Sequence, residues 1–275
     1  MVFILRASSH KSQTPLKEST CANADMTFTR PFGMGVLDGV GGMSEFGLDP
    51  ADLARELRDS LRFHLNSRNY PGSSHGPIKK SKWDDIIRQR LQAPYKAIPA
   101  RGDWLKNLVG ISLSACSLPG SVVIGLVSML GTKLSYFILG DIRLYVFRFC
   151  HVAQYWYTPF KTQPQRDTVL PDGRLMPNQA CMPDAWSFEN LPYIRKLMDT
   201  AEIGRWIVQE GDVVLLCTDG VWENLPGNQL LQVMQELLSN NDPNEIARGI
   251  VESAKKINRK EDDVSCAVGI VTLCR

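Results

Sequence analysis

Three aspartates lie at the boundaries of short apolar segments, where their carboxylates could act together. Asp38 directly follows residues 34–37, Asp219 follows residues 213–218, and Asp262 stands two positions before a long apolar run. An isolated Asp-Gly pair is typical of a turn, because both residues suit turn geometry. Strand ends in one sheet system can also converge on a point. The pattern therefore leaves open either structural turns or one shared carboxylate site.

A shared carboxylate site predicts bound cations. Carboxylates that are brought together repel one another and stay ionised only when cations neutralise them. Hard oxygen ligands favour Mg²⁺ or Mn²⁺ over zinc. The seven cysteines include no Cys-x-x-Cys pair, so neither a zinc ribbon nor a disulfide framework is predicted. We expect an intracellular reducing compartment for such a chain.

Four amphipathic segments predict helices. Asp49-Pro50 has the form of an N-cap followed by proline at the first helical position, and leucines then recur every four residues. Asp242-Pro243 begins a second helix in the same way, with an acidic residue at the capping-box position. The other two helices are predicted within residues 226–240 and 82–97.

Strands are predicted in groups and do not alternate with the helices. Residues 122–130, 133–139 and 142–149 have the pattern of an antiparallel meander, with a turn at 131–132. The apolar segments beside the three aspartates predict further strands. Grouped strands and grouped helices favour the α+β class. Residues 150–200 show no period and are predicted to be irregular, and the basic stretch 66–82 is predicted to be a solvated loop.

Composition excludes some classes of partner. The chain has 275 residues and a net charge of only +2, which gives no electrostatic case for binding nucleic acid. Residues 107–132 carry no charge, but Pro119-Gly120 interrupts them and serines lower their hydrophobicity. We therefore expect a helix followed by a buried strand there, and no stable membrane insertion.

Four motifs carry a resemblance to a known family. Residues 38–42, Asp-Gly-Val-Gly-Gly, resemble the Asp-Gly-His-Gly-Gly signature of the metal-dependent 2C-type serine/threonine protein phosphatases. Residues 216–224, with Thr-Asp-Gly, and residues 261–265, with Asp-Asp, are similar to the second and third aspartate motifs of that family. Residues 139–143 match its Gly-Asp-Ser-Arg turn. The resemblance extends from about residue 20 to the C-terminus, and we expect residues 1–275 to form one phosphatase domain.

The resemblance implies a fold, a site and a reaction. The fold is two packed antiparallel β-sheets flanked by α-helices. Asp38 would bridge two Mn²⁺ or Mg²⁺ ions, with the Gly39 carbonyl on one of them and Asp219 and Asp262 on the other. Asp25 would contact a metal through water. A water molecule activated by the two ions would hydrolyse phosphoserine or phosphothreonine in phosphorylated protein substrates, and a monomer is expected.

Departures from the family pattern leave alternatives. Val40 replaces the histidine that would protonate the leaving group, and Ala24 replaces one residue of an acidic pair. Val40, together with Gly47-Leu48-Asp49-Pro50, resembles a divergent branch whose members are often organellar, including mitochondrial. One alternative is a pseudophosphatase that binds phosphoproteins or acts as a regulatory module. Another is a glycoside hydrolase with two catalytic carboxylates, which would need no metal.

Overall fold

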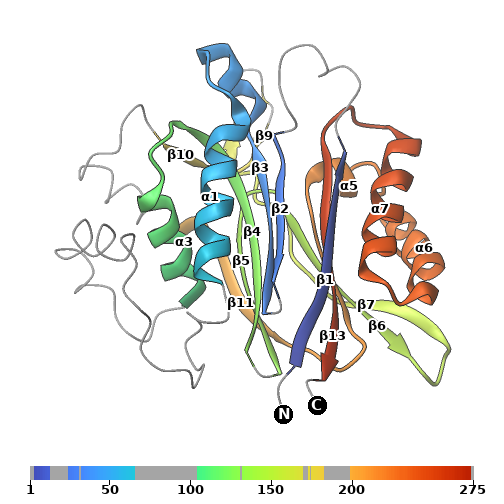
Figure 1. Cartoon of the computed structure of the whole chain (residues 1–275). Helices are drawn as coiled ribbons and strands as arrows, with labels where there is room; N and C mark the ends of the chain where they lie inside the picture. The colour runs from blue at the N-terminus through green and yellow to red at the C-terminus, as the bar shows by residue number, and fades with distance from the viewer. Residues whose placement is uncertain are drawn as a thin grey trace, which may run out of the picture.

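The computed structural model describes residues 3–12, 24–30, 32–65, 104–130, 132–169, 173, 175–182 and 199–273. Two antiparallel β-sheets lie face to face in the centre, and helices cover the outer face of each sheet (Figure 1). The layers run helix, sheet, sheet, helix. This arrangement confirms the predicted α+β class and the predicted pair of packed sheets.

The first sheet has five strands. Their order across the sheet is β1 (Phe3–Ser12), β13 (Val264–Leu273), β12 (Val213–Cys217), β6 (Arg143–Cys150) and β7 (Tyr155–Lys161). β1 and β13 pair antiparallel along their full length. Because β12 and β13 are neighbours, the segments that follow β12 and precede β13 emerge at the same edge of the sheet.

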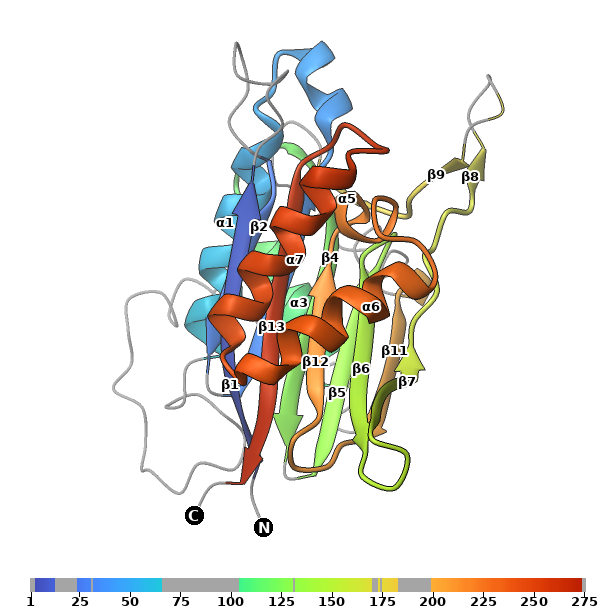
Figure 2. The same ribbon diagram turned by 90° about the vertical axis from the view of Figure 1, so that its right-hand side faces the viewer.

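In the second sheet, β3 lies between β4 and the edge strand β2. Its order is β11 (Glu202–Ile207), β5 (Lys133–Leu139), β4 (Gly120–Leu130), β3 (Gly33–Gly39) and β2 (Met26–Arg30), and the short β10 (Ala180–Met182) also pairs with β4. β8 (Thr168–Val169) and β9 (Leu175–Met176) form a separate hairpin that projects beyond both sheets (Figure 2).

Both faces of the central strands are buried, which explains why their sequences are continuously apolar. On β12, Val213, Leu215 and Cys217 pack in the core under the helices, whereas Val214 and Leu216 pack in the core between the sheets. On β3, Leu37 faces helices and Val36 faces the other sheet. The two-residue period of a strand thus assigns alternate side chains to two different cores.

Helices pack on the outer face of each sheet. α1 (Pro50–His64) contacts β2, β3 and β4, and α3 (Trp104–Ala115) lies beside it. α7 (Pro243–Ile257) covers β1 and β13, and α6 (Asn228–Leu237) lies against α7 (Figure 2). The described residues also form the short helices η2 (Gly41–Phe46), α5 (Asp219–Trp222) and η6 (Leu238–Asn240).

Three predicted helices are confirmed, and two of them begin at the predicted N-cap. The Asp49 side chain accepts a hydrogen bond from the backbone N–H of Ala51 at 2.9 Å, and Asp242 accepts one from Asn244 at 3.0 Å. The uncharged stretch 107–132 is a helix followed by a buried strand, as predicted. Among the residues that the structure describes, no helix is long and apolar enough to span a membrane.

Two predictions about strands were wrong. β4 and β5 form the predicted hairpin, but β6 belongs to the opposite sheet, so the three strands do not make one meander. Strands buried on both faces look alike in sequence, whichever sheet they join. Residues 150–200 are not wholly irregular, because β7 pairs with β6 within that range. The predictions for 66–82 and 82–97 lie outside the described residues.

Candidate active site

Asp38 and Asp25 lie opposite each other on neighbouring strands. In the antiparallel register, Met26 pairs with Leu37. Asp25, which directly precedes β2, therefore lies opposite Asp38, which follows Leu37 on β3. The backbone at Gly39 is closely packed: a Cβ there would lie 2.2 Å from the carbonyl oxygen of Pro50. A side chain at position 39 would therefore displace the start of α1 or the end of β3.

Asp219 and Asp262 lie in adjacent segments because β12 and β13 are paired. Beyond the last strand pair, the backbone N–H of Thr218 donates to the carbonyl of Ser265 at 3.0 Å, and the Ser265 N–H donates to the Thr218 hydroxyl at 3.1 Å. A Cβ at Gly220 would lie 2.1 Å from the carbonyl oxygen of Asp263. Glycine at that position allows the start of α5 to approach the segment that holds Asp262.

Electrostatic interactions connect the predicted aspartates, which lie in one partly buried site. Burial raises the pKa of Asp38 well above its ordinary value, and the charges of Asp25, Asp219, Asp262 and Asp141 raise it further. The pKa of Asp25, a side chain only 1% exposed, is raised to about 7, chiefly by burial and then by the charges of Asp263 and Asp262. Mutual repulsion in a buried site is the expected property of carboxylates that act together on a cation.

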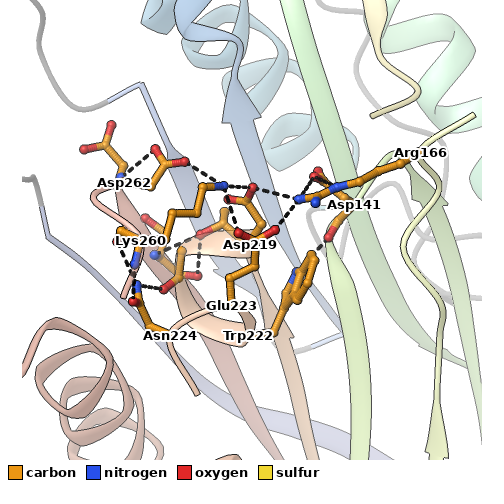
Figure 3. Close-up of polar contacts among 12 residues, drawn as sticks. Asp141, Arg166, Asp219, Trp222, Glu223, Asn224, Lys260 and Asp262 are labelled. Carbon is orange, nitrogen blue, oxygen red and sulfur yellow. Dashed lines mark hydrogen bonds and ion pairs between the residues drawn. The ribbon is translucent and has the colours of Figure 1, made fainter. Parts of the chain in front are cut away.

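Two cationic side chains bind this acidic cluster (Figure 3). The Lys260 ammonium contacts Asp219 Oδ2 and lies 3.0 Å from Asp262 Oδ2. The Arg166 guanidinium donates to Asp141 Oδ2 through Nε at 2.9 Å, and its NH2 nitrogen lies 3.1 Å from Asp219 Oδ2. Burial raises the pKa of Asp219 to about 6 even though Lys260 opposes the rise.

Glu223 and two polar neighbours hold these cations in place. Arg166 NH2 donates to Glu223 Oε1 at 2.6 Å, and Lys260 Nζ lies 3.6 Å from Glu223 Oε2. The Trp222 indole donates to the backbone carbonyl of Asp141 at 2.9 Å, and its ring centre lies 5.0 Å from the Arg166 guanidinium carbon. Asn224 hydrogen-bonds the backbone of Lys260 in both directions, at 2.8 and 3.0 Å.

The donor set has the chemistry of a Mg²⁺ or Mn²⁺ site. All of the clustered side chains that could bind a metal are carboxylates, and the pKa of Asp38 and of Asp25 is raised first by burial and then by neighbouring carboxylates, so a cation would favour their ionised forms. No three His, Cys, Asp or Glu side chains within the described ranges are arranged to hold a metal ion as they stand. Asp219 Oδ2, an oxygen that could bind a metal, instead contacts Arg166 and Lys260.

The structure brings all five sequence-predicted site residues to this place, and it adds residues that the sequence did not identify. Arg166 was missed because it lies in the stretch predicted to be irregular. Lys260 lies two positions before Asp262, and Glu223 lies four after Asp219, so both stand within or beside a quoted motif. Val40 packs partly buried at the core between the sheets, and its backbone N–H donates to Ser121 at 3.0 Å.

Comparison with known proteins finds similarity in sequence and in fold. A family model described as Stage II sporulation protein E (SpoIIE) matches residues 199–269. The protein phosphatase PTC7 homolog fig of Drosophila willistoni is 26% identical over 231 residues, which cover 82% of this chain and 61% of that protein. The chain thus spans less than two thirds of that relative's length.

Solved structures share the fold over nearly the whole chain. The photosystem II phosphatase PBCP aligns with a TM-score of 0.67 and 18% identity, covering 98% of this chain and 99% of that one. The catalytic domain of the serine/threonine protein phosphatase PstP, solved in complex with two manganese ions, aligns with a TM-score of 0.51 and 15% identity, covering 98% of this chain and all of the other. The chain is thus similar in sequence to proteins named protein phosphatase PTC7 homologs and similar in fold to solved phosphatases.

Proposed function

We propose that this chain is a protein serine/threonine phosphatase that depends on Mn²⁺ or Mg²⁺ and acts on phosphorylated proteins. The observation that carries the proposal is the electrostatic interaction among Asp25, Asp38, Asp219 and Asp262, which form a partly buried, oxygen-only cluster at the edge of the paired sheets. Similarity to relatives that are named protein phosphatases supports the reaction class. We also propose that residues 1–275 form a single domain.

The proposed ligands are those that the resemblance of the aspartate motifs implies. Asp38 and the Gly39 carbonyl would serve one cation, and Asp38, Asp219 and Asp262 would serve the second, with Asp25 acting through water. Cations bound there would supply an activated water nucleophile and would neutralise charge on the phosphoryl oxygens. The chain's own contribution is to hold these carboxylates at one point in a site that burial keeps partly dry.

Protonation of the leaving group is the step that this chain must perform differently. Val40 has no titratable group, so the departing serine or threonine oxygen must take its proton from water or from another side chain. General acids contribute about 10²–10⁴-fold in rate. We therefore propose slow turnover of phosphopeptides, and we assign the chain to a divergent branch that has valine at this position.

Two alternatives make different predictions. A pseudophosphatase would bind phosphoproteins without releasing phosphate, and the intact set of proposed ligands speaks against it because loss of a ligand is the simplest route to inactivity. A glycoside hydrolase would work equally well without metal. Similarity to relatives that are named protein phosphatases instead favours the phosphatase.

The test is phosphate release from phosphoserine and phosphothreonine peptides. We expect activity with Mn²⁺, its loss after chelation with EDTA, and its recovery when Mn²⁺ is restored. Asp219→Asn and Asp262→Asn should each abolish turnover, and Glu261→Gln, an exposed neighbour that loses the same charge, should not. Full activity after exhaustive chelation would contradict a metal-dependent mechanism, and binding without turnover would favour the pseudophosphatase.

A further inference from the structure

Lys260 contacts two of the carboxylates that we propose as metal ligands. Its ammonium nitrogen is hydrogen-bonded to Asp219 Oδ2, lies 3.0 Å from Asp262 Oδ2 and lies 3.6 Å from Glu223 Oε2 (Figure 3). The ammonium group is thus a single positive charge placed between oxygens that come from two different segments. A divalent cation held by Asp219 and Asp262 would use the same oxygens.

The attachment of Lys260 allows its ammonium group to leave without any change of backbone. Both backbone polar groups of Lys260 are hydrogen-bonded to the Asn224 side chain, which fixes the main chain at this position. The side chain is 31% exposed, so its head can reach solvent by rotation of a flexible four-carbon stem. The backbone anchor and the movable charge are therefore separate parts of one residue.

Arg166 differs from Lys260 in this respect. Its guanidinium contacts Asp141, Asp219 and Glu223 together and lies against the Trp222 ring. Asp141 is only 3% exposed, so departure of Arg166 would leave a buried carboxylate without its cation. Arg166 is consequently a fixed part of the site, whereas Lys260 can be exchanged.

We propose that Lys260 is a displaceable internal counter-ion that competes with a divalent cation for Asp219 and Asp262. This inference rests on the proposed function. When a cation binds, the Lys260 ammonium turns toward solvent, and when the cation leaves, the ammonium returns and neutralises the two carboxylates. Lys260 is therefore a positioning residue that sets the affinity for metal at one of the two proposed cation positions, and it takes no part in bond breaking.

The experiment is a Mn²⁺ titration of the full chain, followed by the electron paramagnetic resonance signal of free Mn²⁺. A hydrogen bond to a charged group contributes enough free energy to change an affinity about tenfold or more. We expect Lys260→Met to bind at least one Mn²⁺ about tenfold more tightly than the wild type. Lys256→Met removes the same charge from an exposed position on α7 and should leave the affinity unchanged. Equal or weaker binding by Lys260→Met would overturn the proposal.

Thermal melting gives a second readout that does not require activity. In EDTA, Lys260→Met should melt at a lower temperature than the wild type because Asp219 and Asp262 each lose a contact with a cation. Added Mn²⁺ should raise the melting temperature of the variant by a larger increment. An increment equal to that of the wild type would overturn the proposal. If Lys260→Met does not fold, Lys260→Gln keeps a polar head group and should shift the Mn²⁺ affinity in the same direction.

Failure of this inference can be told apart from failure of the proposed function. If the wild type binds Mn²⁺, Asp219→Asn weakens that binding and Lys260→Met leaves it unchanged, only the role of Lys260 is wrong. If the wild type does not bind Mn²⁺, or if Asp219→Asn leaves Mn²⁺ binding unchanged, the proposed metal site is wrong and the inference fails with it.

Discussion

Substitution of Asp25 by asparagine should stabilise the protein in the presence of EDTA. Asp25 is buried, and its pKa is raised to about 7 from an ordinary value of 3.8, first by burial and then by neighbouring carboxylates. A carboxyl group whose pKa is raised in the folded state favours folding when it is protonated. That contribution is fully present below about pH 4 and is lost as the pH rises through about 7. Asparagine is neutral at every pH and avoids the loss.

The size of the effect follows from the two pKa values. By linkage, the raised pKa of Asp25 lowers the free energy of unfolding by at most about 4 kcal/mol at pH 7.5 and by about 2 kcal/mol at pH 5. The free energy of unfolding of Asp25→Asn, relative to that of the wild type, should therefore be about 2 kcal/mol higher at pH 7.5 than at pH 5. The comparison between the two pH values removes any constant effect of the amide on packing.

Urea denaturation in EDTA at both pH values measures this difference. Glu261→Gln is the matched control, because it removes an exposed carboxylate beside the same site and should show little change with pH. Added Mn²⁺ should favour the wild type, since cations remove the repulsion that asparagine removes by substitution. If Asp25→Asn were equally stable relative to the wild type at both pH values, or less stable at pH 7.5 than at pH 5, the electrostatic reasoning would be refuted.

Three further substitutions test other parts of the account. Gly39→Ala places a Cβ 2.2 Å from the Pro50 carbonyl and should cost about 2 kcal/mol of stability or more in urea denaturation, whereas Gly41→Ala meets nothing within 4 Å and should be nearly neutral. Val40→His should raise turnover of phosphopeptides relative to aryl phosphates and add a limb to the pH profile, and an unchanged ratio in a stable variant would show that proton donation is not limiting. Arg166→Met leaves Asp141 buried without its cation and should destabilise the protein by about 3 kcal/mol, measured by urea denaturation in Mn²⁺; a change below about 0.5 kcal/mol would contradict the fixed role of Arg166.

The sequence was sufficient to predict the fold class because its local signals agree with the packing. The caps at Asp49 and Asp242 and the spacing of the apolar residues that follow mark helices whose apolar face meets a sheet. The assignment of β6 to a sheet was not predictable in this way, because Leu144 and Tyr145 are both buried although they point to opposite faces. Only tertiary packing decides which sheet such a strand joins.

The sequence likewise predicts some residues of the candidate site and not others. Asp38, Asp219 and Asp262 stood out because carboxylates at strand boundaries form a repeated local pattern. Arg166 and Lys260 have no such signal, since a cation that pairs with distant carboxylates is defined by three-dimensional proximity: Arg166 reaches Asp219 across 53 positions in the chain. The counter-charges of an acidic site are for this reason harder to predict than the acids themselves.

The most direct test of the central claim is the location of manganese in crystals grown with Mn²⁺. Anomalous scattering at the manganese edge identifies the ions independently of any assumption about the ligands. We expect two peaks beside Asp38, one of them also within bonding distance of Asp219 and Asp262. Peaks at other carboxylates, or no peak at Asp38 in crystals of a protein that hydrolyses phosphopeptides, would contradict that claim.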